Sequence, residues 1–172
     1  MDIKVEDGKL FVDGVIQSAY PPPDWGYWQF MVPDFEPKNV LILGAGLGTI
    51  AQLIRDKYPD TLIILGIEIN PEITELPDNS KSRGMLVIET DAFEYIYKLK
   101  KAEWDLIIVD LWNGGWFNIK VLQNEFLDQC KKILTANGKI YINAPDIEKL
   151  ASIAGLREKT KTESANIIYE TT

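Results

Sequence analysis

"VLILGAGLG", residues 40–48, places a short apolar run directly before a glycine turn. The apolar run predicts a strand buried on both faces, and the turn would lead into a helix N-terminus. Gly44, Gly46 and Gly48 lack side chains, so the backbone there can turn sharply and approach a ligand closely. The dinucleotide-binding fingerprint needs glycine or alanine at the next position, where this chain has Thr49. The turn alone is therefore weak evidence for a dinucleotide site.

Apolar runs alternate with helical stretches throughout the rest of the chain. Runs of Val, Ile and Leu without period-two alternation predict buried strands, and strand-helix alternation predicts a parallel sheet. The tail, residues 156–172, can add one or two antiparallel edge strands. We predict an α/β fold with a doubly wound, mostly parallel Rossmann-like sheet and an antiparallel C-terminal edge. The expected strands are 39–44, 61–69, 85–90, 104–110 and 139–144, and the expected helices are 49–58, 71–76, 92–101, 119–134 and 146–155.

The N-terminal segment has a different character. Residues 3–19, "IKVEDGKLFVDGVIQSA", contain two short apolar runs and two Asp-Gly turns, which predict a small β-hairpin. The proline-rich and aromatic stretch "PPPDWGYWQFM" follows at 21–31. A chain of 172 residues can bury one core. We expect residues 1–32 to form a hairpin and an aromatic lid, and residues 33–172 to form the Rossmann-like ligand-binding domain.

Composition narrows the function classes. The formal net charge of −8 argues against a nucleic-acid partner and is compatible with a cationic substrate. The lone Cys130 lies in a helical pattern, which favours a packed thiol over a nucleophile. No apolar N-terminal run has the length of a signal peptide or a membrane span, so we expect a cytoplasmic protein without a membrane partner. The sequence lacks histidine, which leaves carboxylates and tyrosines for proton chemistry, and no metal is expected.

Acidic residues follow three of the predicted strands, at the sheet edge where such folds bind ligands. Glu68 lies about 20 residues beyond the glycines, the spacing of a carboxylate that binds ribose hydroxyls. Asp91 could accept from an adenine amino group beside the backbone of Ala92, or cap the following helix, or do both. Asp110 follows four apolar residues and precedes a glycine-rich aromatic loop, which favours a carboxylate facing a cavity over a solvated charge.

This arrangement resembles the adenosyl-ligand site of class I S-adenosylmethionine-dependent transferases, and the resemblance covers residues 39–145. Within that superfamily the chain looks most like the spermidine synthase (polyamine aminopropyltransferase) family. "LFVDGVIQ" at 10–17 is similar to that family's "L-x-L-D-G-x-x-Q" hairpin, and "GYWQFM" falls where the family has a Tyr-His-Glu-Met stretch. "VLILGAGLG", "GIEIN", "TDAFEYI" and "DLIIVD" then follow in family order.

The resemblance implies a role for each matching residue. Gln17 would contact the donor, Glu68 its ribose, Asp91 its adenine, and Tyr27 and Asp110 the reacting amine. The donor would be S-adenosylmethionine or its decarboxylated form, the acceptor a small-molecule amine, and the assembly a homodimer. The sequence departs from the family pattern at four positions: Leu47 replaces an aspartate, Trp28 and Gln29 replace histidine and glutamate, and Asn113 lies near the place of a second acid.

Three functions remain open from the sequence. The first is aminopropyl transfer, with Asp110 attracting the amine and accepting its proton and Tyr27 orienting it. The second is methyl transfer from S-adenosylmethionine to a small molecule, and the third is non-catalytic binding of an adenosyl ligand. Aromatic side chains would line a water-poor cavity that attracts cations, unless a dimer interface buries them instead. The residues expected in that cavity are Trp25, Tyr27, Trp28, Trp112, Trp116 and Phe117.

Overall fold

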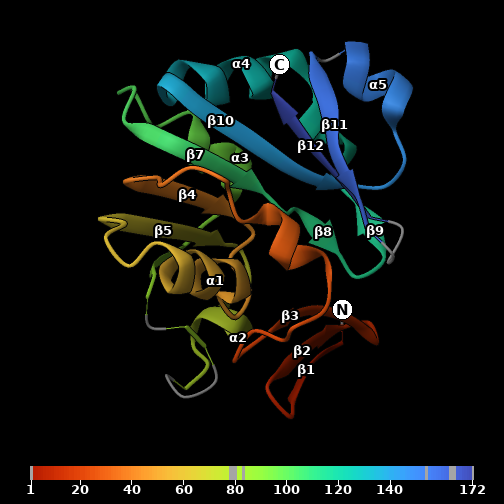
Figure 1. The fold of residues 1–172 in the computed structure, drawn as a ribbon. Coiled ribbons are helices and arrows are strands. Elements are labelled where there is room, and N and C mark those ends of the chain that lie inside the picture. The colour runs from red at the N-terminus through yellow and green to blue at the C-terminus, as the bar shows by residue number, and fades with distance from the viewer. Residues whose placement is uncertain (1, 78–80, 83, 154, 163–165, 172) are drawn as a thin grey trace.

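The computed structural model describes residues 2–77, 81–82, 84–153, 155–162 and 166–171. A seven-stranded sheet in the order β11-β12-β10-β7-β4-β5-β6 forms its centre (Figure 1). β12 (Ile167–Thr171) runs antiparallel to β10, and β11 (Leu156–Lys161) runs antiparallel to β12. The predicted mostly parallel sheet with an antiparallel C-terminal edge is therefore confirmed. The parallel strands are β4 (Asn39–Leu43), β5 (Ile63–Glu68), β6 (Leu86–Glu89), β7 (Trp104–Val109) and β10 (Leu134–Ala144).

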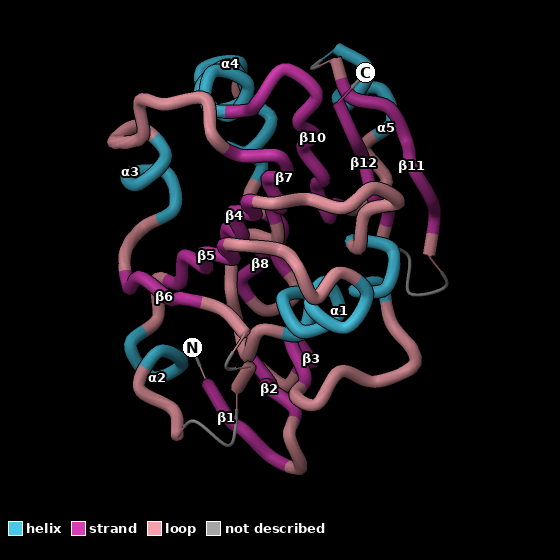
Figure 2. Tube along the Cα trace, turned by 60° about the vertical axis from the view of Figure 1, so that its left-hand side comes forward, coloured by secondary structure: helices cyan, strands magenta, loops and turns pink. Residues whose placement is uncertain are grey.

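Helices cover both faces of this sheet (Figure 2). α1 (Thr49–Lys57) lies on one face, whereas α3 (Ala92–Ile96), α4 (Asn124–Ile133) and α5 (Glu148–Ile153) pack on the other. α2 is a single turn, Pro71–Thr74. α3 is about half as long as predicted: it ends at Ile96, and the next two side chains, Tyr97 and Lys98, are exposed. No helix in the described part of the chain has the length and apolar character needed to span a membrane.

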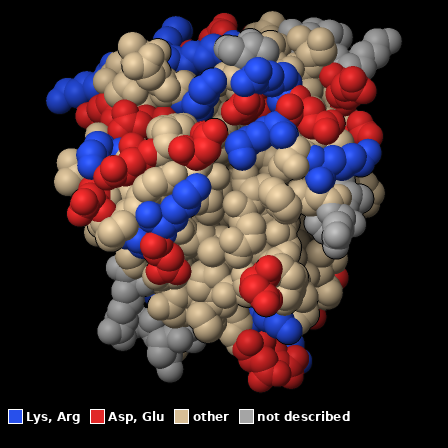
Figure 3. Space-filling view, in the orientation of Figure 1, with Lys and Arg blue, Asp and Glu red and all other residues tan. Residues whose placement is uncertain are grey.

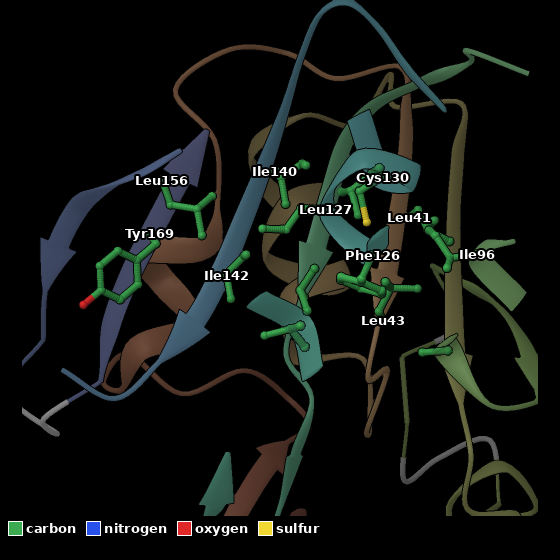
Figure 4. Close-up of a cluster of buried hydrophobic side chains, with 14 of the residues drawn as sticks. Leu41, Leu43, Ile96, Phe126, Leu127, Cys130, Ile140, Ile142, Leu156 and Tyr169 are labelled. Carbon is green, nitrogen blue, oxygen red and sulfur yellow. The ribbon is translucent and has the colours of Figure 1, made fainter. Parts of the chain in front are cut away.

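Alternating side chains of the strands supply two cores. In β4, Val40 and Ile42 pack toward α1, whereas Leu41 and Leu43 pack toward α3 and α4. Figure 4 shows the second core, in which the side chain of Cys130 lies among aliphatic and aromatic neighbours. Cys130 is fully buried, and burial raises the pKa of its thiol to about 12. The prediction of a packed thiol is confirmed.

The N-terminal segment forms a small antiparallel sheet of three strands: β1 (Ile3–Glu6), β2 (Lys9–Val12) and β3 (Val15–Ala19). The sequence predicted only one hairpin here. Both Asp-Gly pairs turn the chain, with positive φ at each of their residues, so the meander gains a third strand. The short helix η1 (Tyr27–Met31) follows it. Figure 1 shows this small sheet beside the carboxyl ends of β4 and β5.

Thr49 explains how the small sheet is attached. Its hydroxyl donates to the carbonyl of Ala19 at 2.7 Å and accepts from the amide of the same residue at 2.8 Å. Ser18 adds a second link, because its hydroxyl accepts from the amide of Leu47 at 3.0 Å. Leu47 is fully buried between the two parts, against Leu10 and neighbouring aliphatic side chains. The residue that breaks the dinucleotide fingerprint thus anchors β3 to the N-terminus of α1.

Candidate functional site

A cavity of about 310 Å³ opens at the carboxyl ends of β4, β5 and β7. This volume lies in the range of small-molecule sites. The strand order reverses at β4, which pairs with β5 on one side and β7 on the other, so the cavity occupies the topological switch point of the sheet. Eight of the nine predicted site residues line it: Gln17, Tyr27, Gly44, Gly46, Glu68, Asp91, Ala92 and Asp110.

The glycine turn brings two strand ends into contact. Gly44 has a φ of +91°, and a side chain there would collide with the carbonyl oxygen of Asp110. Its replacement would therefore push the ends of β4 and β7 apart. Gly48, the remaining predicted residue, does not line the cavity, since its missing side chain would meet Ser82 instead.

Glu68 ends β5 and is 8% exposed. One carboxylate oxygen accepts from the amide of Gly46 at 3.0 Å, and the other accepts from the amides of Ile69 at 3.0 Å and Asn70 at 3.1 Å. Burial raises the pKa of Glu68, and the three amides act in the opposite direction. A carboxylate offers about four acceptor positions, so roughly one remains for a ligand hydroxyl.

Asp91 caps the N-terminus of α3. Its Oδ1 atom accepts from the amide of Glu94 at 3.0 Å, which confirms the capping role that the sequence allowed. Asp91 and the adjacent Ala92 also line the cavity, so capping leaves the residue in a position to meet a ligand. Its contact with an adenine stays a prediction.

Asp110 lies at the end of β7 and is bound on both oxygens. Oδ2 accepts from the hydroxyl of Tyr27 at 2.8 Å, and Oδ1 accepts from the amide Nδ2 of Asn143 at 2.8 Å. Burial raises the pKa of Asp110 to about 6, whereas these two donors lower it and the charge of Glu68 raises it. Burial and the charge of Asp110 raise the pKa of Tyr27 well above its usual value, so the phenol stays protonated at neutral pH.

Asn143 is a site residue that the sequence analysis missed. It is fully buried near the carboxyl end of β10, where its Oδ1 accepts from Nδ2 of Asn166 at 2.8 Å. Its main-chain carbonyl accepts from the indole of Trp112 at 3.1 Å. A single amide in the apolar run "IYINA" at a strand end was the signal that could have revealed it.

Gln17 joins two structures above the cavity. Its Nε2 donates at 3.0 Å to the carbonyl of Gly114, which lies in the turn between β8 (Trp112–Asn113) and β9 (Trp116–Phe117). The N-terminal sheet and the β8–β9 hairpin therefore meet across the cavity. The predicted contact of Gln17 with a donor stays a prediction.

The aromatic lining is smaller than the sequence predicted. Tyr27, Trp28 and Trp112 line the cavity, but Trp25 and Trp116 lie outside it and are 48% and 82% exposed. In the β8–β9 hairpin, Trp112 is paired with Phe117, so their rings share one side of the hairpin with centroids 5.5 Å apart. Trp116 is paired with Asn113 and does not line the cavity. The predicted six-residue cage is wrong for Trp25, Trp116 and Phe117, none of which lines the cavity.

The charged side chains that line the cavity are all acidic among the described residues. Glu68, Asp91 and Asp110 line it, and no Lys or Arg does among the residues that the structure describes. On the molecular face of Figure 3, blue and red side chains are interspersed, and the visible described residues form no continuous basic area. No group of three or more His, Cys, Asp or Glu side chains in the described ranges is arranged to hold a metal ion.

Two curated proteins named polyamine aminopropyltransferase are similar to this chain. The one from Vibrio vulnificus is 27% identical over 121 residues, which cover 67% of this chain and 40% of the relative. The one from Chromobacterium violaceum is 26% identical over 121 residues, covering 66% of this chain and 45% of the relative. The chain thus spans less than half the length of these relatives. No family model matches it.

Solved structures share the fold. A spermidine synthase in complex with the transition-state analogue AdoDATO superposes with a TM-score of 0.70 and 20% identity, covering 94% of this chain and 64% of that chain. Human methyltransferase-like protein 13 in complex with SAH gives a TM-score of 0.64 and 22% identity, covering 79% of this chain and 72% of that chain.

The fold is a doubly wound, mostly parallel Rossmann-like sheet of the class I methyltransferase type. In sequence the chain is similar to curated polyamine aminopropyltransferases, in line with the resemblance of its motifs to that family.

Proposed function

We propose that this chain binds decarboxylated S-adenosylmethionine and transfers its aminopropyl group to a small-molecule amine. The observation that carries the proposal is a cavity lined by three acidic residues and no cationic one among its described residues, with the hydrogen-bonded pair Tyr27–Asp110 in its lining. Its sequence relatives carry the name of this activity. In this proposal the N-terminal segment, residues 1–32, forms the roof of the site and acts as its lid.

The two possible donors differ in charge. S-adenosylmethionine carries a carboxylate that its decarboxylated form lacks, and the acidic lining would repel it. Leu47, which replaces a family aspartate, is buried outside the cavity and therefore does not contact the donor directly. The cavity thus favours a donor whose charged groups are a sulfonium and an ammonium.

The transfer itself needs positioning and the removal of one proton. The lone pair of a neutral amine attacks the carbon beside the sulfonium, that carbon–sulfur bond breaks, and a neutral thioether leaves. A protonated amine must first lose one proton to free its lone pair, and Asp110 would accept that proton; attack by the neutral amine then gives an ammonium product. With a pKa of about 6, its carboxyl group is mostly ionised at pH 7.5 and attracts the cationic acceptor.

Calorimetric titration with the two donors tests this proposal. We expect the decarboxylated donor to bind at least about tenfold more tightly, which corresponds to about 1.4 kcal/mol. Diamines and monoamines would then be screened for aminopropyl transfer. Equal or tighter binding of S-adenosylmethionine would contradict the proposal and favour methyl transfer instead.

The remaining expectations need their own tests. Tight donor binding without turnover of any amine would favour the non-catalytic binding protein, and no binding of either donor would exclude both transfer reactions. The homodimer and the cytoplasmic location stay predictions.

A further inference from the structure

A chain of hydrogen bonds runs from the carboxylate of Asp110 to the antiparallel edge of the sheet. Nδ2 of Asn143 donates to Asp110, and Oδ1 of Asn143 accepts from Asn166, both at 2.8 Å. Asn143 is fully buried in β10, the strand beside β7. The link therefore joins three neighbouring segments of chain through one amide.

We propose that Asn143 is a positioning residue that holds the carboxylate of Asp110 ready to receive the amine. The catalytic part of this inference rests on the proposed aminopropyl transfer, whereas the effect of Asn143 on the carboxylate does not.

The two partners of Asn143 fix the orientation of its amide. If the amide rotated by half a turn, its oxygen would face the carboxylate of Asp110 and its NH₂ group would face the NH₂ group of Asn166. Both contacts would then be repulsive instead of attractive. Asn143 can consequently present only donor hydrogens to Asp110, and it cannot take the proton that Asp110 is meant to receive.

The donors of Asp110 come from two directions. Tyr27 binds Oδ2 from η1, and Asn143 binds Oδ1 from β10, so both ends of the carboxylate group are held. Each oxygen keeps acceptor capacity for an incoming ammonium. A carboxylate fixed in this way need not reorganise during the reaction, which is the benefit of a preorganised site.

The titration of Asp110 reflects this contact. Burial raises its pKa, the hydrogen bonds from Asn143 and Tyr27 lower it, and Glu68 is the charged group that raises it further. Without the Asn143 donor, only the Tyr27 hydrogen bond would counteract the increase in pKa that burial and Glu68 cause. The pKa of Asp110 would therefore rise.

Two variants of Asn143 test the inference, with one matched control. Asn143→Leu removes the donor while keeping a side chain branched at Cγ, and Asn143→Asp keeps the shape but places a second carboxyl group beside Asp110. Asn39→Leu is the control, because its amide donates to the carbonyl of Glu103 at the opposite end of the sheet. The first measurement is a carbon NMR titration of the Asp110 carboxyl group in the ligand-free proteins.

We expect the pKa of Asp110 to rise by about one unit in Asn143→Leu. In Asn143→Asp the two carboxyl groups should titrate as a coupled pair, with the upper value raised by about two units or more. Asn39→Leu should leave the pKa unchanged. A folded Asn143→Leu or Asn143→Asp protein whose Asp110 titrates within about 0.3 units of the original would overturn the inference.

Kinetics supply the second measurement. For Asn143→Leu we expect kcat at pH 5.5 to fall about eightfold, because a one-unit rise in pKa reduces the ionised carboxylate by that factor, and to recover as pH rises, with the KM of the amine changed less than about threefold. A purely structural role would lower kcat at every pH, and that result would contradict the inference. If the original protein turned over no amine while the pKa shift appeared, the proposed function would fail and the positioning of the carboxylate would stand.

Discussion

Glu68 and Asp110 end the two strands that flank β4, yet they are held in different ways. Burial raises the pKa of both carboxyl groups. Three main-chain amides donate to Glu68: two belong to the next two residues in the chain, and one belongs to the glycine turn. Asp110 instead accepts from side chains of η1 and β10. The partners of Asp110 lie 83 and 33 positions away in the sequence.

The different donors suit Glu68 and Asp110 to different roles in the same cavity. No substitution other than proline removes a main-chain donor, so the environment of Glu68 is nearly constant and suits an invariant part of a ligand. Side-chain donors can be exchanged one at a time, so the environment of Asp110 is adjustable and suits the reacting end. Removal of each carboxylate should therefore affect different measurements.

The largest effect is expected for Asp110→Asn, which keeps the size of the side chain and removes its charge. Turnover should fall by about 10²- to 10⁴-fold, the usual contribution of a general base, while donor affinity changes less than about threefold. Steady-state kinetics and calorimetry measure the two quantities. Asp105→Asn, at the opposite end of the same strand, is the matched control. Unchanged turnover in Asp110→Asn would remove Asp110 from the mechanism.

The same substitution should change how stability depends on pH. Because the pKa of Asp110 is raised from 3.8 to about 6, the folded protein binds more protons than the unfolded chain between these values. Its free energy of unfolding then decreases as pH rises through this window, by up to about 3 kcal/mol. The Asp110→Asn variant has no carboxyl group to titrate, so its free energy of unfolding does not decrease in this way. Relative to the original protein, its stability should therefore rise between pH 4 and pH 7. Urea unfolding at several pH values measures it, and parallel pH curves would contradict the raised pKa.

A smaller effect is expected for Glu68→Gln. Glutamine presents an NH₂ group to at least one of the main-chain amides that now donate to the carboxylate, which should cost about 1–2 kcal/mol of stability. Donor affinity should fall about tenfold as the ribose loses its acceptor. Glu89→Gln, at the exposed end of neighbouring β6, is the matched control. If affinity for the donor survives in Glu68→Gln, the assignment of Glu68 to the ribose is wrong.

The sequence predicted those parts of the molecule that depend on local patterns. Apolar runs predicted the strands, and the strand-end rule brought Glu68, Asp91 and Asp110 to one cavity before any contact was known. The N-cap role of Asp91 also follows from its neighbours in the chain. Each of these inferences needs only residues that lie close together in the sequence.

Features that depend on distant pairings were missed. Asn143 becomes a partner of Asp110 only because β10 lies beside β7, and the sequence does not state which strands are neighbours. The position of Trp116 depends on the register of the β8–β9 hairpin, which its sequence did not reveal. Thr49 departs from the glycine motif, and its role depends on two hydrogen bonds to Ala19 of β3, 30 positions away in the sequence.

The contact between Gln17 and Gly114 has a consequence for the order of assembly. These residues are 97 positions apart, so the roof of the cavity is synthesised first and can join the β8–β9 hairpin only after four of the parallel strands have emerged. The cavity is consequently enclosed only after those strands are available. A ligand whose binding requires the roof would bind a fully folded chain. It would not bind a chain in which only the central sheet has formed.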